Sequence, residues 1–339
     1  MTPPPDFASD FTAASFAPAA APGPLHASDA SRTSVALGRD FAGTAAAIAA
    51  DVSRLTRPRI ALMVLATVVA SMWLTAGRGV GGPVLFWLLV GTTLVAASSS
   101  IANQILERDA DRLMPRTARR PIAAGRLSVP VAVMLATLLV AAGGLMITLA
   151  AGWQPAVAAL TTWILYVAVY TPMKMRSPLN TAVGAVSGAL PVAIGWLAAD
   201  GPGRLASGDA AGTLAVAALA TVLYLWQFPH FMAIAWLYRG QYAAAGMRML
   251  TVDDPSGLRA AGQALAASLA MVPVSLVLAV PSGSIRLFLA AAIASLVYAV
   301  ATVGFAVRRD DASARTLLFT SLGSLLALLT ASVVFGPPT

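Results

Sequence analysis

Uncharged stretches of hydrophobic residues recur along most of the chain, separated by short polar segments. Each is about 20 residues long, the length at which an α-helix crosses a bilayer core of about 30 Å. None shows the alternation of a barrel strand, and a helix satisfies its own backbone hydrogen bonds in lipid. We therefore predict an all-α fold, a polytopic membrane helical bundle of about nine transmembrane helices. The predicted spans are 59–77, 83–106, 128–150, 154–172, 179–199, 211–236, 260–280, 286–307 and 316–335.

The N-terminal part of the chain lacks this pattern. Residues 1–41 are rich in Pro, Ala and Ser and have no periodic apolar face, which predicts a disordered tail. They also lack the basic start and continuous apolar core of a signal peptide. Residues 42–58 are predicted to form an interfacial lead-in helix. Residues 59–336 are predicted to form a single transmembrane domain.

Composition agrees with a membrane protein, because 58% of the residues are hydrophobic and 11% are charged. Cysteine is absent, which excludes disulfides, zinc–thiolate sites and iron–sulfur clusters. The chain has one glutamate, Glu107, and one lysine, Lys174.

The distribution of positive charge predicts the orientation of the bundle. If the N-terminus is cytoplasmic, only Arg78, Arg204 and Arg286 of the 22 basic residues fall in the opposite loops. The positive-inside rule therefore favours a cytoplasmic N-terminus. Because the basic residues lie in short loops at the membrane surface, the net charge of +8 indicates anionic lipids or a phosphorylated substrate rather than nucleic acid.

Acidic residues gather where the second predicted span ends, in NQILERDAD (103–111). Asn103, Glu107 and Asp111 are four residues apart and therefore share one helix face. Such a row of oxygen ligands suits Mg²⁺, which takes one or two carboxylates and completes its shell with substrate phosphate oxygens. The alternative is a solvated helix end at which the acids pair with neighbouring arginines.

Two basic segments favour a phosphate site over that alternative. They are RTARRPIAAGR (116–126) and YTPMKMRSPLN (170–180), both expected on the same membrane side as the acids. Arg makes forked contacts with phosphate oxygens, and Lys supplies a mobile point charge. Carboxylates that bind a metal and basic side chains that bind phosphate, both beside an apolar bundle, would suit a substrate with a diphosphate group and an apolar tail. We interpret Arg119 and Arg126 as ordinary positive-inside residues.

A third polar cluster lies within the sixth predicted span, where Gln227 and His230 interrupt an apolar segment. An ionisable residue inside a membrane span suggests a functional site. The alternative is structural, because Pro229 frees a backbone carbonyl that His230 could satisfy.

These motifs resemble those of the UbiA superfamily of intramembrane prenyltransferases, over about residues 54–335. NQILERDAD is similar to the superfamily's metal motif, and WQFPHF (226–231) resembles its haem-modifying branch. In that branch, the segment matching YRGQYAAAGMRML (238–250) is acidic, whereas this chain has Gly240 and Gln241. The remaining segments that carry the resemblance are TRPRI (56–60), RTARRP (116–121), YTPMKMRSPLNT (170–181) and GALPVAIGW (188–196).

The resemblance implies that farnesyl diphosphate prenylates a vinyl group of haem b, with addition of water, to give haem O. It also implies the site residues. The catalytic residues would be Asn103, Glu107, Asp111 and Lys174, and the first three would bind Mg²⁺. A second metal site would use Gln241, Asp253 and Asp254. Diphosphate binding falls to Arg116, Arg120, Arg176, Asn180 and Arg239, and haem binding to His230, Gln227 and Trp226. His230 would either ligate the iron or orient a propionate.

The expected setting is the inner (plasma) membrane of a bacterium, with the site facing the cytoplasm and a haem-O-oxidising enzyme as a candidate partner. Two other functions remain open. Prenylation of an aromatic quinone precursor would share the diphosphate site but would not need WQFPHF. A transporter without catalytic activity would place its functional charges near the bilayer midplane.

Overall fold

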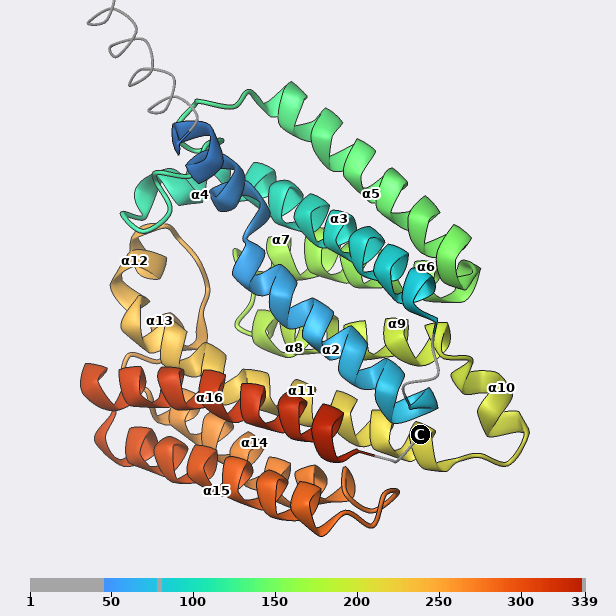
Figure 1. The fold of residues 1–339 in the computed structure, drawn as a ribbon. Coiled ribbons are helices and arrows are strands. Elements are labelled where there is room, and N and C mark those ends of the chain that lie inside the picture. The colour runs from blue at the N-terminus through green and yellow to red at the C-terminus, as the bar shows by residue number, and fades with distance from the viewer. Residues whose placement is uncertain (1–45, 78–80, 337–339) are drawn as a thin grey trace, which may run out of the picture. The chain divides into compact units, whose positions relative to one another are not determined.

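The computed structural model describes residues 46–77 and 81–336, and these residues confirm the all-α prediction (Figure 1). Nine helical segments of this described part are long and apolar enough to cross a membrane, so the chain is an integral membrane protein. All nine predicted spans overlap them. The segments are Pro58–Ala76 (α2), Gly82–Leu106 (α3), Val129–Ala151 (α5), Trp153–Met173 (α6, η1 and α7), Asn180–Ala198 (α8 and α9), Ala211–Leu237 (α11), Leu258–Val277 (α14), Ile285–Arg308 (α15) and Asp311–Phe335 (α16).

The account below concerns the unit that begins at Ala50. The predicted tail, residues 1–41, lies outside the described residues, as do the first residues of the predicted lead-in helix. Residues 46–56 are helical. The helix ends at Arg57, whose backbone is left-handed (φ 50°), and α2 begins at Pro58. Gln104 of α3 holds the end of this helix by donating to the carbonyls of Arg54 (3.1 Å) and Leu55 (3.0 Å).

The fourth and fifth spans are irregular. The fourth changes from α6 (Trp153–Ile164) to a π-helical turn, η1 (Leu165–Tyr170), and then to α7 (Thr171–Met173). The fifth breaks between α8 (Asn180–Ala189) and α9 (Pro191–Ala198). Tyr170 of η1 packs against Gly184 of α8, where a Cβ would lie 2.7 Å from the ring. The π-helical turn and this glycine together place the Tyr170 ring inside the bundle.

Helix α11 is the centre of the bundle and packs against α2, α8, α14 and α16. The largest buried cluster extends from α11 to α14, α15 and α16. On the other side, α3 pairs with α5 through Gly91 and Gly143, where a Cβ on Gly143 would lie 2.6 Å from the Gly91 carbonyl oxygen. Small residues of this kind allow two membrane helices to approach closely.

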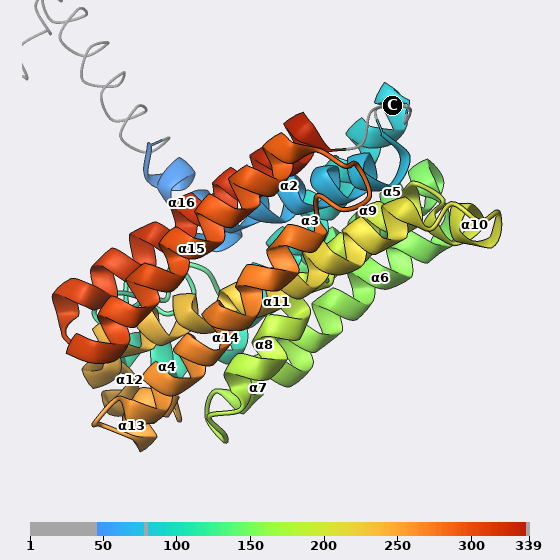
Figure 2. The ribbon, with the colours of Figure 1, turned by 90° about the horizontal axis from the view of Figure 1, so that it is seen from below.

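Short helices at one end of the bundle carry many of the polar residues of interest. They are α4 (Arg108–Leu113), α12 (Arg239–Ala244) and α13 (Leu250–Asp253), whereas α10 (Gly201–Ala206) lies at the opposite end (Figures 1 and 2). Because successive spans alternate in direction, the polar segments after the second, fourth and sixth spans meet at one end. This arrangement brings the acidic and basic motifs together.

Candidate active site

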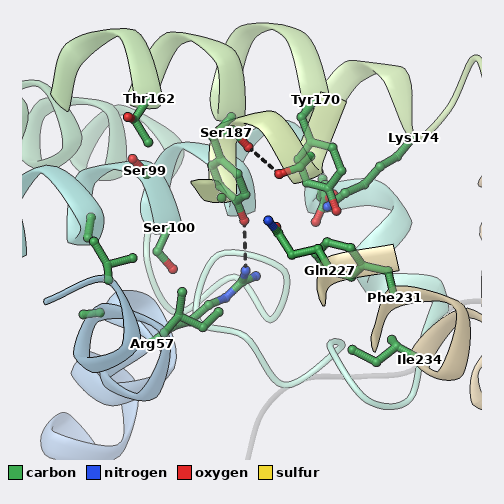
Figure 3. A pocket seen from close by; sticks show the side chains of 18 of the residues that line it. Arg57, Ser99, Ser100, Thr162, Tyr170, Lys174, Ser187, Gln227, Phe231 and Ile234 are labelled. Carbon is green, nitrogen blue, oxygen red and sulfur yellow. Dashed lines mark hydrogen bonds and ion pairs between the residues drawn. The ribbon is translucent and has the colours of Figure 1, made fainter. Parts of the chain in front are cut away.

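A cavity of about 350 Å³ extends from the polar end of the bundle into its apolar interior (Figure 3). Its mouth is charged, and its deeper walls come from α2, α3, α6, α8, α9 and α11. The charged lining residues are Arg57, Glu107, Asp111, Arg116, Arg120 and Lys174. Among the apolar ones are Ile60, Val64, Val95, Ala159, Pro191 and Ile194. The cavity thus joins a charged mouth to a space suited to a hydrocarbon.

Glu107 forms the central ion pair of the mouth. It caps the C-terminus of α3, is 8% exposed, and has its Oε1 2.7 Å from Lys174 Nζ. Burial favours a higher pKa for Glu107, but Lys174, helped by Arg57 and Arg120, holds the pKa below its usual value. Burial also disfavours charged Lys174, yet Glu107 and Tyr170 raise the pKa of the ammonium group. Both partners are therefore charged at neutral pH.

Asp111 is fully buried and pairs with Arg120. Nη1 of Arg120 lies 2.7 Å from Oδ1 and 2.6 Å from Oδ2 of Asp111, and 3.6 Å from Oε2 of Glu107. Burial raises the pKa of Asp111 although Arg120 opposes the shift. One arginine from the loop after α4 therefore bridges both carboxylates that line the cavity.

Asn103 lies beside the mouth but does not line the cavity. Its amide oxygen accepts from Arg57 Nη2 (3.1 Å), and its amide nitrogen donates to Thr171 Oγ1 (3.1 Å). Arg57 also contacts the Tyr166 hydroxyl (3.5 Å) and lines the cavity. Arg57 was not among the predicted site residues, although it lies in the TRPRI motif. The geometry makes Asn103 a residue that positions Arg57.

Arg116 also lines the cavity and lies against two tyrosines. Its guanidinium is 4.6 Å from the Tyr238 ring centroid, and Nη2 donates to the Tyr242 hydroxyl (3.3 Å). Tyr242 and Tyr170 line the cavity, and neither was among the predicted site residues. Their aromatic character is the only signal in the sequence, and it does not distinguish them from core residues.

Three expected diphosphate ligands lie away from the cavity lining. Arg176 is exposed. Asn180 is buried and donates to the carbonyls of Ser177 (2.7 Å) and Arg248 (3.1 Å). Arg239 pairs with Asp311 (3.0 Å) and donates to the carbonyl of Trp236 (2.6 Å). The contacts of Asn180 and of Arg239 therefore join loops to helix ends.

The residues considered for a second metal site do not converge on the cavity. Asp253 pairs with Arg248 (3.3 Å), and Asp254 accepts from the backbone amides of Ser256 (3.2 Å) and Arg259 (2.8 Å). Within the described chain, Gln241 Oε1 is buried without a hydrogen-bond partner, and no group of three or more His, Asp or Glu residues could hold a metal. The carboxylates of Glu107 and Asp111 do fit Mg²⁺, since it needs only one or two carboxylates beside a phosphate.

The expected haem ligands are separated by the fold. Gln227 lines the cavity and donates to the carbonyls of Ala185 (2.9 Å) and Leu223 (3.0 Å). Trp226 and His230 are not among the lining residues. Trp226 Nε1 donates to the Ser321 carbonyl (2.7 Å), and His230 Nδ1 lies 2.7 Å from Ser321 Oγ and stacks on Trp226 at 4.6 Å. Two of the three residues therefore contact α16 instead of the cavity.

Comparisons with known proteins agree on one family. The model of the UbiA prenyltransferase family matches residues 64–326. A protein of Rhodopirellula baltica named protoheme IX farnesyltransferase is 42% identical over 288 residues, which are 81% of this chain and 96% of that protein. A mitochondrial protein of Arabidopsis thaliana with the same name is 39% identical over 224 residues, or 66% of this chain and 50% of that protein.

A solved structure supports the fold. It is that of a UbiA homolog from Archaeoglobus fulgidus bound to DMAPP and Mg2+, which is 17% identical and superposes with a TM-score of 0.60. The superposition covers 84% of this chain and 99% of that one. The similarity of fold therefore extends over most of this chain.

Proposed function

Because the chain belongs to the UbiA prenyltransferase family, we propose that it transfers the farnesyl group of farnesyl diphosphate to a vinyl group of haem b. Water adds to the same vinyl group, and the product is haem O. The name of the relatives supports this acceptor. The observation that carries the proposal is that one continuous cavity joins Glu107, Asp111 and Lys174 to an apolar interior. Family membership also favours an enzyme over a transporter.

The charged mouth is the proposed diphosphate site. Glu107 and Asp111 would hold Mg²⁺, which supplies Lewis-acid stabilisation of the departing diphosphate. Lys174 and Arg120 already lie against these carboxylates, and each carries donors that can turn to phosphate oxygens. Arg57 and Arg116 face the same cavity. Asn103 is proposed to hold Arg57 in place, so removing its amide would act through that arginine.

The apolar interior is the proposed site of carbon–carbon bond formation. Loss of diphosphate leaves an allylic cation, which the electron-rich vinyl carbon attacks. The cation must not meet water before that step, and an apolar wall excludes water. The aromatic residues Tyr166, Tyr170 and Phe231 line the cavity. An aromatic face also attracts a cation directly.

Gln227 is the proposed contact to the acceptor, because it is the one expected haem ligand that lines the cavity. His230 and Trp226 are proposed to hold α11 against α16 through Ser321. No contact of haem with His230 is needed in this arrangement.

Extraction of haems from a host that lacks haem O tests the proposed function. Cells that express the wild-type chain should contain farnesylated haem identifiable by mass. Glu107→Gln should abolish the product, whereas Asp109→Asn should retain it, because Asp109 is exposed and pairs with the partly exposed Arg108 and Arg112. Membrane-inserted wild-type protein that prenylates an aromatic quinone precursor and never haem would contradict the acceptor.

The proposed setting is a bacterial inner membrane with the cavity mouth in the cytoplasm, where a haem-O-oxidising enzyme would take the product. The absence of cysteine allows a direct test, since single cysteines can be labelled without background. Ser256 and Ser207 are exposed at opposite ends of the bundle. We expect a membrane-impermeant thiol reagent to label Ser207→Cys in intact cells and Ser256→Cys only after lysis. The reverse pattern would invert the orientation.

A further inference from the structure

Hydroxyl groups line the otherwise apolar part of the cavity. Those below the charged mouth belong to Thr92, Ser99, Ser100, Thr162 and Ser187. Three of them donate to a carbonyl of their own helix: Ser99 to Val95 (2.9 Å), Thr162 to Ala158 (2.8 Å) and Ser187 to Gly184 (2.9 Å). Since each hydroxyl has one proton and two lone pairs, these three oxygens remain able to accept hydrogen bonds.

Ser100 and Thr92 differ from the other three. They are 5% and 2% exposed, and neither hydroxyl has a hydrogen-bond partner within the described part of the chain. Both line the cavity. A buried hydroxyl without a partner is unfavourable, and such groups in native proteins call for a ligand or a water. The cavity wall therefore contains hydroxyl groups that can still donate, those of Thr92 and Ser100, beside hydroxyl oxygens that can still accept.

Ser99, Ser100 and Thr162 lie at one level of the bundle. A hydrogen bond from Trp163 Nε1 to Ser98 Oγ (3.0 Å) joins α6 to α3 there. Thr162 directly precedes Trp163, and Ser99 and Ser100 directly follow Ser98. Figure 3 shows Thr162, Ser99 and Ser100 on the same side of the pocket, across from Gln227 and Lys174. We call these three residues the hydroxyl cluster.

The hydroxyl cluster is deeper in the cavity than the acids. Ser100 precedes Glu107 by seven residues on α3, a separation of roughly 10 Å along a helix axis. A nucleophile held there is away from the bond between farnesyl C1 and the diphosphate. When C1 bonds to the terminal vinyl carbon, the positive charge moves to the inner vinyl carbon. This carbon is two carbon–carbon bonds away from C1. The second cation is therefore centred on a different carbon from the one that carried the diphosphate.

We infer that the hydroxyl cluster holds the water molecule that adds to this second cation, an inference that rests on the proposed haem farnesylation. Ser100 would donate to the water oxygen, and Ser99 and Thr162 would accept its protons. A buried water typically needs two to four such partners. The water oxygen forms a bond to the inner vinyl carbon. One proton of this water is lost, and the released diphosphate at the mouth is its final acceptor. Haem b, farnesyl diphosphate and water thus give haem O and protonated diphosphate.

Without a positioned water, the same cation has another outcome. It loses a proton from the adjacent carbon to the diphosphate and leaves an alkene, so the product is lighter than haem O by one water. The ratio of hydrated to dehydrated farnesylhaem therefore reports on the hydroxyl cluster. Because both products form from the same cation, the ratio does not depend on the amount of folded enzyme.

The experiment compares this ratio among full-length variants expressed in a host that lacks haem O. For Ser100→Ala and Thr162→Val we expect the ratio to fall about tenfold, the effect of losing about 1.4 kcal/mol. Ser100→Thr keeps a hydroxyl and should keep the ratio. Ser98→Ala is the matched control, since Ser98 is buried beside the hydroxyl cluster but bonds to the Ala136 carbonyl (2.7 Å) and Trp163 instead. Its ratio should equal that of the wild type.

Three results would overturn the inference. An unchanged ratio in both Ser100→Ala and Thr162→Val would mean that the water is held elsewhere. A raised KM for haem with an unchanged ratio would mean that the hydroxyls bind polar groups of the acceptor. Wild-type enzyme that makes no farnesylated haem would remove the proposed function as well, and this failure is seen without any variant.

Discussion

Replacing Lys174 with methionine tests the buried ion pair at the cavity mouth. Lys174 Nζ lies 2.7 Å from Glu107 Oε1, and the two side chains are 14% and 9% exposed. At that distance and an effective dielectric constant of about 20, the gross attraction is about 6 kcal/mol, most of it offset by desolvation. Removing one partner leaves the other charge buried, which costs about 3–5 kcal/mol. Because Arg120 still lies 3.6 Å from Glu107, we expect the lower end, about 3 kcal/mol.

A double-mutant cycle separates the pair from the cost of leaving one charge alone. In Glu107→Gln, Lys174 loses its carboxylate partner but keeps a cation–π contact with Tyr170, whose ring centroid lies 4.5 Å from Nζ. The double variant removes both charges, so its loss should be smaller than the sum of the single losses by about 2–3 kcal/mol. The measurement is the free energy of unfolding of all four proteins in mixed detergent micelles, without Mg²⁺ or substrate.

Ligand addition links the same cycle to function. Mg²⁺ and farnesyl diphosphate together at about 100 times Kd should stabilise the wild type by about 2.7 kcal/mol and should not stabilise Glu107→Gln. The exposed pair of Asp109 and Arg112 is the control, and its coupling should be near zero. Additive single losses for Lys174 and Glu107, or equal ligand stabilisation of Glu107→Gln, would refute the reasoning.

Three further predictions follow from the packing. Gly143→Ala should lower the free energy of unfolding by about 1–3 kcal/mol, because its Cβ would lie 2.6 Å from the Gly91 carbonyl oxygen. Gly144→Ala should be nearly neutral, because its Cβ would meet only Leu160, at 3.9 Å. Asp253→Asn should leave the Mg²⁺ concentration for half-maximal turnover unchanged, and a tenfold increase would return Asp253 to the metal site. His230→Ala should weaken thermal stability but retain haem affinity in a spectroscopic titration; loss of that affinity would show that His230 contacts haem.

The sequence alone located the membrane spans and placed Glu107 close to Asp111, although α3 ends at Leu106 and Asn103 does not line the cavity. Insertion into a bilayer depends on the hydrophobicity of each segment by itself, so uncharged runs of sufficient length are enough to locate the helices. The closeness of Glu107 and Asp111 is also a local property. It follows from the helical period, because α4 begins directly after Glu107. These properties need no knowledge of which helices are neighbours.

Only the tertiary structure decided which polar side chains share the cavity. Arg57 reaches it because its left-handed backbone and Asn103 orient it, while the equally basic Arg176 remains exposed. Gln227 and His230 are three residues apart on α11, yet Gln227 lines the cavity and His230 contacts Ser321 on α16. A side chain's surroundings depend on helices that are distant in sequence, and no local pattern specifies how those helices pack.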